Sequence, residues 1–133
     1  MTEVVRDFTY TFINKDTVKV TWASLDDDDS GKAVDLSGYP DKTVQILGTF
    51  GGATCKLYGS NDPAVITDRN AGTLFGSKTA EWINVVDPQG NAISKTAAAV
   101  EAVLENTQYY CPVNTGGSGT TLSVIIVASR ASK

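Results

Sequence analysis

The sequence predicts an all-β fold, an antiparallel sandwich or barrel of about eight strands in one domain spanning residues 1–133. Short runs of alternating apolar and polar residues recur along the chain, and clusters of turn-forming residues separate them. The runs are rich in Val, Ile, Thr and aromatic residues, which favour strands. With 133 residues, the chain is long enough to bury a proper hydrophobic core.

The first predicted strand, residues 4–13, places Phe8, Tyr10 and Phe12 on one face, because side chains alternate along a strand. The second predicted strand, residues 17–25, alternates in the same way. The remaining predicted strands are residues 33–36, 43–50, 54–60, 81–87, 107–113 and 120–129.

Two segments between these strands are irregular. Residues 64–79 are predicted as a long loop. Residues 96–106, TAAAVEAVLEN, place Val100, Val103 and Leu104 at helical spacing, and alanine is a strong helix former. We therefore expect one short helix over residues 96–106.

Gly48, Gly51 and Gly52 form a glycine cluster that invites comparison with a phosphate-binding loop. Such a loop requires a Lys and a Ser or Thr after its last glycine, followed by a helix. Here the cluster is followed by ATCKLYGS, which alternates like a strand. We therefore expect a hairpin turn over residues 50–53, with a β-bulge at Gly48.

The composition excludes several classes of function. The chain has no histidine, which removes Ser-His-Asp and Cys-His catalysis and the usual acid or base near neutral pH. Its net charge of −4 opposes nucleic-acid binding, which requires clustered Lys and Arg. No apolar run approaches the ~20 residues of a membrane helix. Chemistry by carboxylates or lysine remains open, and an enzyme that uses these groups is a third alternative. We expect no catalytic residues, no enzyme activity, no cofactor, no nucleic-acid partner and no membrane partner.

The acidic run DDDDSG resembles the start of a calcium-binding loop. On the EF-hand template, Asp26, Asp28 and Ser30 would occupy the first three ligand positions, but the twelfth falls on Ser37 in place of a bidentate Glu. Two cysteines without histidine cannot complete the usual four-ligand zinc site. We therefore expect a solvated acidic loop and no metal site.

Cys55 and Cys111 both lie inside predicted strands. The N-terminus lacks the basic start and apolar core of a signal peptide, which predicts synthesis in the cytoplasm. In that compartment two buried, reduced thiols are favoured over a disulfide.

The last predicted strand is apolar on both faces at its centre, because Ile125 and Val127 lie opposite the apolar face of Leu122, Val124 and Ile126. A strand of this kind is either covered on both sides or packed against another subunit. Within one chain, the loop over residues 64–79 or the alanine-rich segment could cover this second apolar face. The sequence leaves both alternatives open, a cover within the chain and a contact with another subunit.

The run VQILGTFGGATCKLYGSND, followed by Trp82 with DPQGNAI and then by YYCPVNTGGSGTTLSVIIVASR, resembles small structural proteins of tailed-phage virions. These are cement, or decoration, proteins, which bind the outside of the capsid. The similarity covers residues 43–130, about two thirds of the chain. It implies a jelly-roll β-sandwich without catalysis, made in the host cytoplasm and placed on the capsid exterior, with the major capsid protein as its partner.

The same glycine turn followed by a tryptophan strand is also similar to the pattern of discoidin-like jelly rolls, which bind sugars or lipids. Trp and Tyr side chains on a β-sandwich can stack against sugar rings. A carbohydrate-binding module on a virion or tail surface is therefore the alternative function.

Residues 1–14 lie outside the region of resemblance, and their three aromatic side chains would be exposed without a partner. We expect an extended N-terminal arm that docks on a neighbouring subunit or on the capsid, with an ordinary first strand as the alternative. Self-association as a dimer or trimer would use this arm and the last strand. The candidate interface residues are Phe8, Tyr10, Phe12, Ile125 and Val127.

Overall fold

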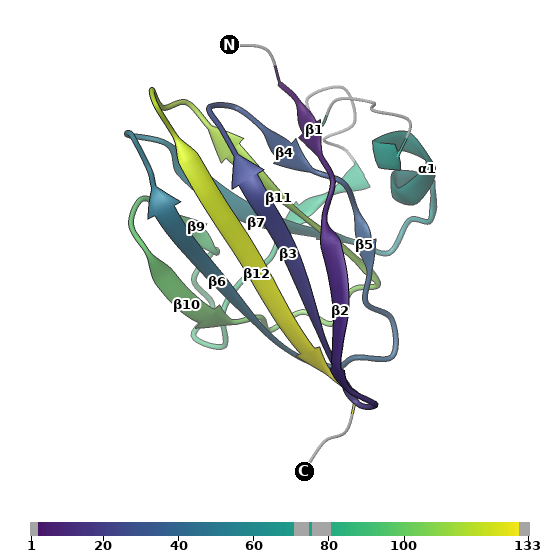
Figure 1. Cartoon of the computed structure of the whole chain (residues 1–133). Coiled ribbons are helices and arrows are strands. Elements are labelled where there is room, and N and C mark those ends of the chain that lie inside the picture. Colours follow the sequence, from purple (N-terminus) through teal and green to yellow (C-terminus); the bar gives the residue numbers. More distant parts are fainter. Residues whose placement is uncertain (1–2, 71–74, 76–80, 131–133) are drawn as a thin grey trace.

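Two β-sheets pack face to face and form a sandwich (Figure 1). The computed structural model describes residues 3–70, 75 and 81–130. Strands dominate this part of the chain, which also contains a short helix, α1 (Ala64–Asn70). The predicted all-β class is confirmed.

The sheet nearer the viewer in Figure 1 has five strands in the order β10-β6-β12-β3-β2, and every neighbouring pair is antiparallel. The central strand, β12, therefore has a hydrogen-bonding partner on each side. The strands are β10 (Ala99–Ala102), β6 (Asp41–Thr49), β12 (Thr121–Ser129), β3 (Thr17–Leu25) and β2 (Thr9–Asn14).

The second sheet has seven strands, most of them short, around the longer pair β11 and β7. Its main path is β1-β4-β11-β7-β8, while β5 also pairs with β11 and β9 also pairs with β7. The strands are β1 (Val5–Arg6), β4 (Ser30–Gly31), β5 (Val34–Asp35), β7 (Thr54–Ser60), β8 (Ile83–Asn84), β9 (Ser94–Lys95) and β11 (Tyr109–Thr115).

The strand order from β3 onward is that of a jelly roll. With β4 and β5 counted as one strand, and β8 and β9 as another, the chain runs through eight strand positions. In one sheet, the first position pairs with the eighth and the third pairs with the sixth. In the other sheet, the second position pairs with the seventh and the fourth pairs with the fifth. The fold is therefore a jelly-roll-like antiparallel sandwich.

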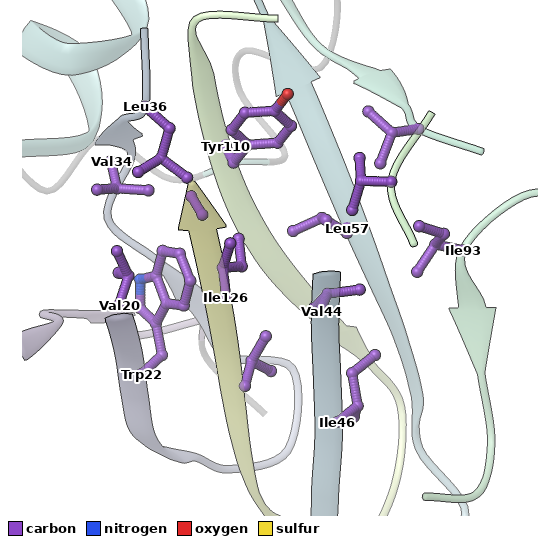
Figure 2. Close-up of a cluster of buried hydrophobic side chains, with 14 of the residues drawn as sticks. Val20, Trp22, Val34, Leu36, Val44, Ile46, Leu57, Ile93, Tyr110 and Ile126 are labelled. Atoms are coloured by element: carbon purple, nitrogen blue, oxygen red, sulfur yellow. The ribbon is translucent and has the colours of Figure 1, made fainter. Parts of the chain in front are cut away.

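The main core lies between the sheets and is formed by side chains from the inner face of each sheet (Figure 2). Trp22 from β3 and Ile126 from β12 are fully buried there, and burial of one such side chain is worth about 1.5–3 kcal/mol. Two buried aromatic side chains of the core donate hydrogen bonds to backbone carbonyl oxygens. Trp22 Nε1 donates to the Lys32 carbonyl at 3.1 Å, and the Tyr110 hydroxyl donates to the Glu105 carbonyl at 2.8 Å.

A second apolar cluster covers the outer face of the seven-stranded sheet. Val65 of α1 packs there with Phe75 and Trp82 against Tyr109 and Cys111 of β11. The rings of Phe75 and Trp82 lie 6.1 Å apart between their centres. As a result, β11 is buried on both faces over most of its length.

The helix predicted over residues 96–106 is wrong, because this segment contains the edge strand β10. β10 pairs with β6 from Ala99 opposite Ile46 to Ala102 opposite Thr43. The helix propensity of alanine is a weak preference, and pairing with an available strand outweighs it.

The helix of the structure lies instead in the segment predicted as a loop, residues 64–79, of which residues 71–74 and 76–79 lie outside the described residues. Asp62 Oδ1 accepts a hydrogen bond from the backbone N–H of Ala64 at 2.9 Å, which caps the start of α1. Pro63 occupies the first helical position, where its missing N–H costs nothing.

The glycine cluster forms a tight turn, as predicted, but the turn is not a hairpin. The backbone N–H of Ala53 donates to the Phe50 carbonyl at 2.9 Å, and Gly51 and Gly52 have φ values of 57° and 87°. Two consecutive positive φ values are typical of a type I′ turn. The flanking strands, β6 and β7, belong to different sheets, so the turn carries the chain across the sandwich.

The bulge predicted at Gly48 is also wrong. Gly48 remains in regular register with Leu122 of β12, and the irregularity falls between Leu122 and Val124 in the neighbouring ladder with β3. A glycine is needed at this position for another reason, because a Cβ atom there would collide with the Thr121 carbonyl oxygen.

The N-terminal residues do not form a separate arm. β1 pairs in parallel with β4, and β2 pairs with β3 from Thr9 opposite Thr21 to Asn14 opposite Thr17. The segment therefore passes from one sheet to the other and completes both, which corrects the arm predicted over residues 1–14. The backbone of β1 pairs with β4 and that of β2 pairs with β3, so both strands have partners within the same chain.

Candidate functional site

Ile125 and Val127 lie on the outer face of the five-stranded sheet, on the side away from the core. Both are half-buried, although β12 is the central strand. Val100, at the edge strand β10, shares this face and is 61% exposed. Cross-strand neighbours of Ile125 and Val127, which share the outer face, are Gln45, Thr21, Thr43 and Lys19.

Neither segment proposed as a cover lies over this outer face within the described residues. α1 and Phe75 pack on the other sheet, where they cover β11, and the alanine-rich segment extends the five-stranded sheet as β10. The outer face therefore combines aliphatic side chains with polar side chains and the charged Lys19.

Phe8, Tyr10 and Phe12 point to the opposite side of the same sheet. Tyr10 lies opposite Val20, and Phe12 lies opposite Val18, both of which face the core. The seven-stranded sheet does not reach over these aromatic residues, so Tyr10 remains 37% exposed and Phe12 61% exposed. The structure thus divides the candidate interface residues between two separate surfaces.

The three aromatic residues are held by contacts between rings. Phe8 packs edge-on against the buried Trp22 with 5.7 Å between ring centres, and Tyr10 packs edge-on against Phe12 at 5.5 Å. Such pairs are worth about 0.5–1.5 kcal/mol beyond the burial of their area. This restricts the motion of exposed rings that would otherwise rotate freely.

A groove of about 460 Å³ opens between β2 and the segment that begins at β5. We call it the aromatic groove. One wall is formed by the N-terminal aromatic residues, and the other carries polar groups from two distant parts of the chain. The residues that line it are Phe8, Tyr10, Val34, Asp35, Ser37, Tyr39 and Arg130.

Arg130 is fixed at this groove by Tyr39. Arg130 Nη2 donates to the Tyr39 hydroxyl at 2.8 Å, and its guanidinium carbon lies 5.0 Å from the centre of the Tyr39 ring. Stacking of this kind is attractive because the face of an aromatic ring is negative. No ion pair to Arg130 is present among the described residues, so the charge is not neutralised by a carboxylate.

The tyrosine hydroxyls of the aromatic groove have shifted pKa values. Partial burial, followed by the neighbouring Tyr39 hydroxyl, raises the pKa of Tyr10 to about 12. Hydrogen bonding with the Tyr10 hydroxyl lowers the pKa of Tyr39, and Arg130 lowers it further. The raised pKa keeps the Tyr10 hydroxyl neutral at physiological pH.

Lys42 is a buried cation at the end of the main core, with 4% of its surface exposed. Its Nζ donates to the Tyr39 carbonyl at 2.7 Å and to Asn106 Oδ1 at 2.8 Å, and it lies 5.3 Å from the centre of the Tyr110 ring. Burial lowers the pKa of Lys42 to about 8, and Asp41 opposes part of this shift. The hydrogen bonds join two loops, which gives Lys42 a structural role.

The acidic loop makes hydrogen bonds to two neighbouring backbone segments. Asp27 Oδ1 accepts from the Thr120 N–H at 2.8 Å, and Asp28 Oδ1 accepts from the Gly116 N–H at 2.7 Å. Hydrogen bonding from Thr120 lowers the pKa of Asp27. The prediction of a solvated loop is too simple, because Asp29 is only 2% exposed. In the described part of the chain, no group of three or more His, Cys, Asp or Glu is placed to hold a metal ion.

Cys55 and Cys111 are both buried thiols, as predicted. Cys55 belongs to the main core, whereas Cys111 belongs to the cluster on the outer face of the seven-stranded sheet. Because the two thiols point to opposite faces of one sheet, they cannot meet without disrupting it.

Comparisons of the chain with models of protein families, with curated proteins and with solved structures found no match. Over the residues that the structure describes, no helix is long and apolar enough to cross a membrane. The outer face and the aromatic groove are therefore the two candidate functional surfaces of the described chain.

Among the residues of the aromatic groove, the sequence singled out Phe8 and Tyr10, as candidate interface residues, but not Tyr39 or Arg130. The alternation of Phe8 and Tyr10 was visible in the sequence, but Tyr39 and Arg130 carry no local signal. They are 91 residues apart and meet only because β12 ends beside the segment that leads into β6.

Proposed function

We propose that the chain is a structural protein of a tailed-phage virion, which binds the outside of the capsid and stabilises the shell as a cement, or decoration, protein. The observation that carries this proposal is the uncovered outer face around Ile125 and Val127. A strand at the centre of a sheet places two aliphatic residues there, and no described segment covers them.

The chemistry of the outer face suits contact with another protein. Aliphatic side chains at its centre gain up to about 1.5–3 kcal/mol each when a partner removes them from water, and less where they are already half-buried. The surrounding Thr and Gln side chains provide hydrogen-bonding groups at the rim, which is the usual arrangement of an interface.

A single face of this size binds weakly, because association costs about 4–15 kcal/mol in lost translational and rotational freedom. We therefore propose that the chain self-associates as a dimer or trimer on the capsid, so that several faces engage the lattice together. Linked contacts raise the apparent affinity without any new kind of contact. The proposed role requires no catalysis, and the protein would act on the capsid exterior after synthesis in the host cytoplasm.

The experiment mixes the purified chain with undecorated shells of the major capsid protein encoded in the same genome, and then separates bound from free chain by sedimentation. We expect the wild-type chain to sediment with the shells. Ile125→Asp should reduce binding by at least about tenfold, because it places a charge at the centre of the contact.

The matched control is Ile83→Asp, which makes the same change on the edge strand β8 of the other sheet, where Ile83 is 69% exposed. This variant should bind shells like the wild type. Failure of the wild-type chain to sediment with shells, or equal loss of binding in both variants, would count against the proposal.

A further inference from the structure

We propose that the aromatic groove is a binding site for a glycan, in which one sugar ring packs against the aromatic wall and its hydroxyl groups reach the polar wall. This site lies on the opposite side of the five-stranded sheet from the outer face, so it is independent of the capsid contact proposed above. Its volume of about 460 Å³ falls within the roughly 300–1,000 Å³ of small-ligand sites.

The aromatic wall offers a surface on which a sugar ring can stack. Phe8 and Tyr10 supply this wall, and Tyr10 remains 37% exposed because the two-residue strand β5 is too short to cover it. Edge-on contacts of Phe8 with Trp22 and of Tyr10 with Phe12 orient the two rings. Rigid aromatic side chains supply contact area at a low cost in conformational entropy.

The polar wall supplies both kinds of hydrogen-bonding group that sugar hydroxyls require. The guanidinium of Arg130 uses one of its five N–H donors for Tyr39, which leaves others directed to the surroundings. Asp35 is exposed and uses Oδ1 to accept from the Ser37 N–H at 2.9 Å, so its second oxygen can accept from a ligand. A pair of neighbouring hydroxyls, each able to donate and accept, complements this combination.

Other classes of ligand would make fewer favourable contacts with the groove. A phosphate or another anion would match Arg130 but would be repelled by Asp35. A proline-rich peptide would contact the aromatic wall and leave the polar wall without partners. The joint presence of stacking surface, fixed cation and carboxylate therefore favours a neutral sugar.

The test screens the full chain against an array of immobilised neutral and acidic oligosaccharides and measures the affinity of any ligand found by isothermal titration. We expect binding to a neutral glycan. Tyr10→Ala and Arg130→Gln should each weaken that binding by about tenfold or more, through loss of the stacking surface and of the fixed donors respectively.

The matched control for Arg130→Gln is Lys19→Gln, which removes one positive charge from the outer face of β3 and should leave glycan affinity unchanged. Circular dichroism melts confirm that each variant is folded. Absence of glycan binding by the wild-type chain, binding that survives both groove variants, or preferential binding of a polyproline peptide would each overturn the proposal.

Discussion

The side chain of Arg6 reaches from strand β1 to the buried carboxylate of Asp29, with Nε donating to Oδ2 at 2.7 Å. The same carboxylate accepts hydrogen bonds from the backbone N–H groups of Val4 and Asp26. Asp29 thus connects the N-terminal residues to the acidic loop. This connection explains why the N-terminal segment is part of the sandwich and not a free arm.

Arg6→Ala should destabilise the protein by about 2–3 kcal/mol. Removing one partner of a buried pair costs ~3–5 kcal/mol, but Arg6 is 36% exposed, so water reduces the effect. Urea unfolding measures the change. Lys95→Ala is the control, since it breaks the partly exposed pair with Glu101 and should cost only about 0–1 kcal/mol. Equal effects of the two substitutions would contradict the role of Asp29.

Neighbouring residues of β12 should respond very differently to truncation. Ile126 is fully buried in the main core, so Ile126→Ala should cost about 2–5 kcal/mol. Ile125 lies half-buried on the outer face, and Ile125→Ala should cost less than about 1 kcal/mol in the isolated protein. The midpoints of urea unfolding compare the two variants. A large loss of stability in Ile125→Ala would place this side chain in a covered core.

Lys42 should make stability increase with pH above about 8. Burial lowers its pKa from 10.5 to about 8 in the folded protein, so between these values the unfolded chain holds a proton that the folded chain has released. Stability rises with pH wherever the unfolded state binds more protons. The neutral amine keeps two N–H donors, enough for the short hydrogen bonds to Tyr39 and Asn106.

Urea unfolding across this pH range tests the effect, with Lys42→Met as the variant. The difference in stability between wild type and Lys42→Met should grow in favour of the wild type as the pH rises from about 8 toward 10. The exposed Lys19→Met serves as the control and should show no such trend. If the difference in stability between wild type and Lys42→Met does not change with pH, the pKa of Lys42 is not lowered in the folded protein.

Both cysteines should stay reduced and unreactive in the folded protein. Burial raises the pKa of Cys55 to about 12, which leaves almost no thiolate to react at neutral pH. Iodoacetamide should therefore label the thiols only after unfolding, and a mild oxidant should produce no bridge between Cys55 and Cys111. Intact mass spectrometry detects both reactions. A bridge formed without loss of the native circular dichroism spectrum would show that the two thiols can meet.

Much of the fold could be predicted from the sequence because it depends on local patterns. The alternation in β3 and β12 predicts which side chains face the core, and Val20, Trp22 and Ile126 are buried there. The turn at Gly51 and Gly52 was also predictable, since few other residues accept two consecutive positive φ values.

Other features were decided by the tertiary structure alone. Alanine at positions 99 and 102 favours a helix locally, but the open edge of β6 offers hydrogen bonds that make the segment a strand. No local pattern tells whether a turn joins strands of one sheet or of two, so the crossing at Gly51 could not be foreseen. For the same reason, the sequence did not show that α1 covers the outer face of β11 and not that of β12, because the position of α1 depends on the topology.

The sequence by itself determined the alternation of the long strands β3 and β12 and the absence of histidine chemistry, because each follows from composition or from neighbours along the chain. Only the tertiary structure brought Tyr39 and Arg130 together with Tyr10 at one groove, and left Ile125 uncovered on the opposite side. These relationships join residues far apart in the sequence, and their energy comes from packing two sheets, which no short segment encodes.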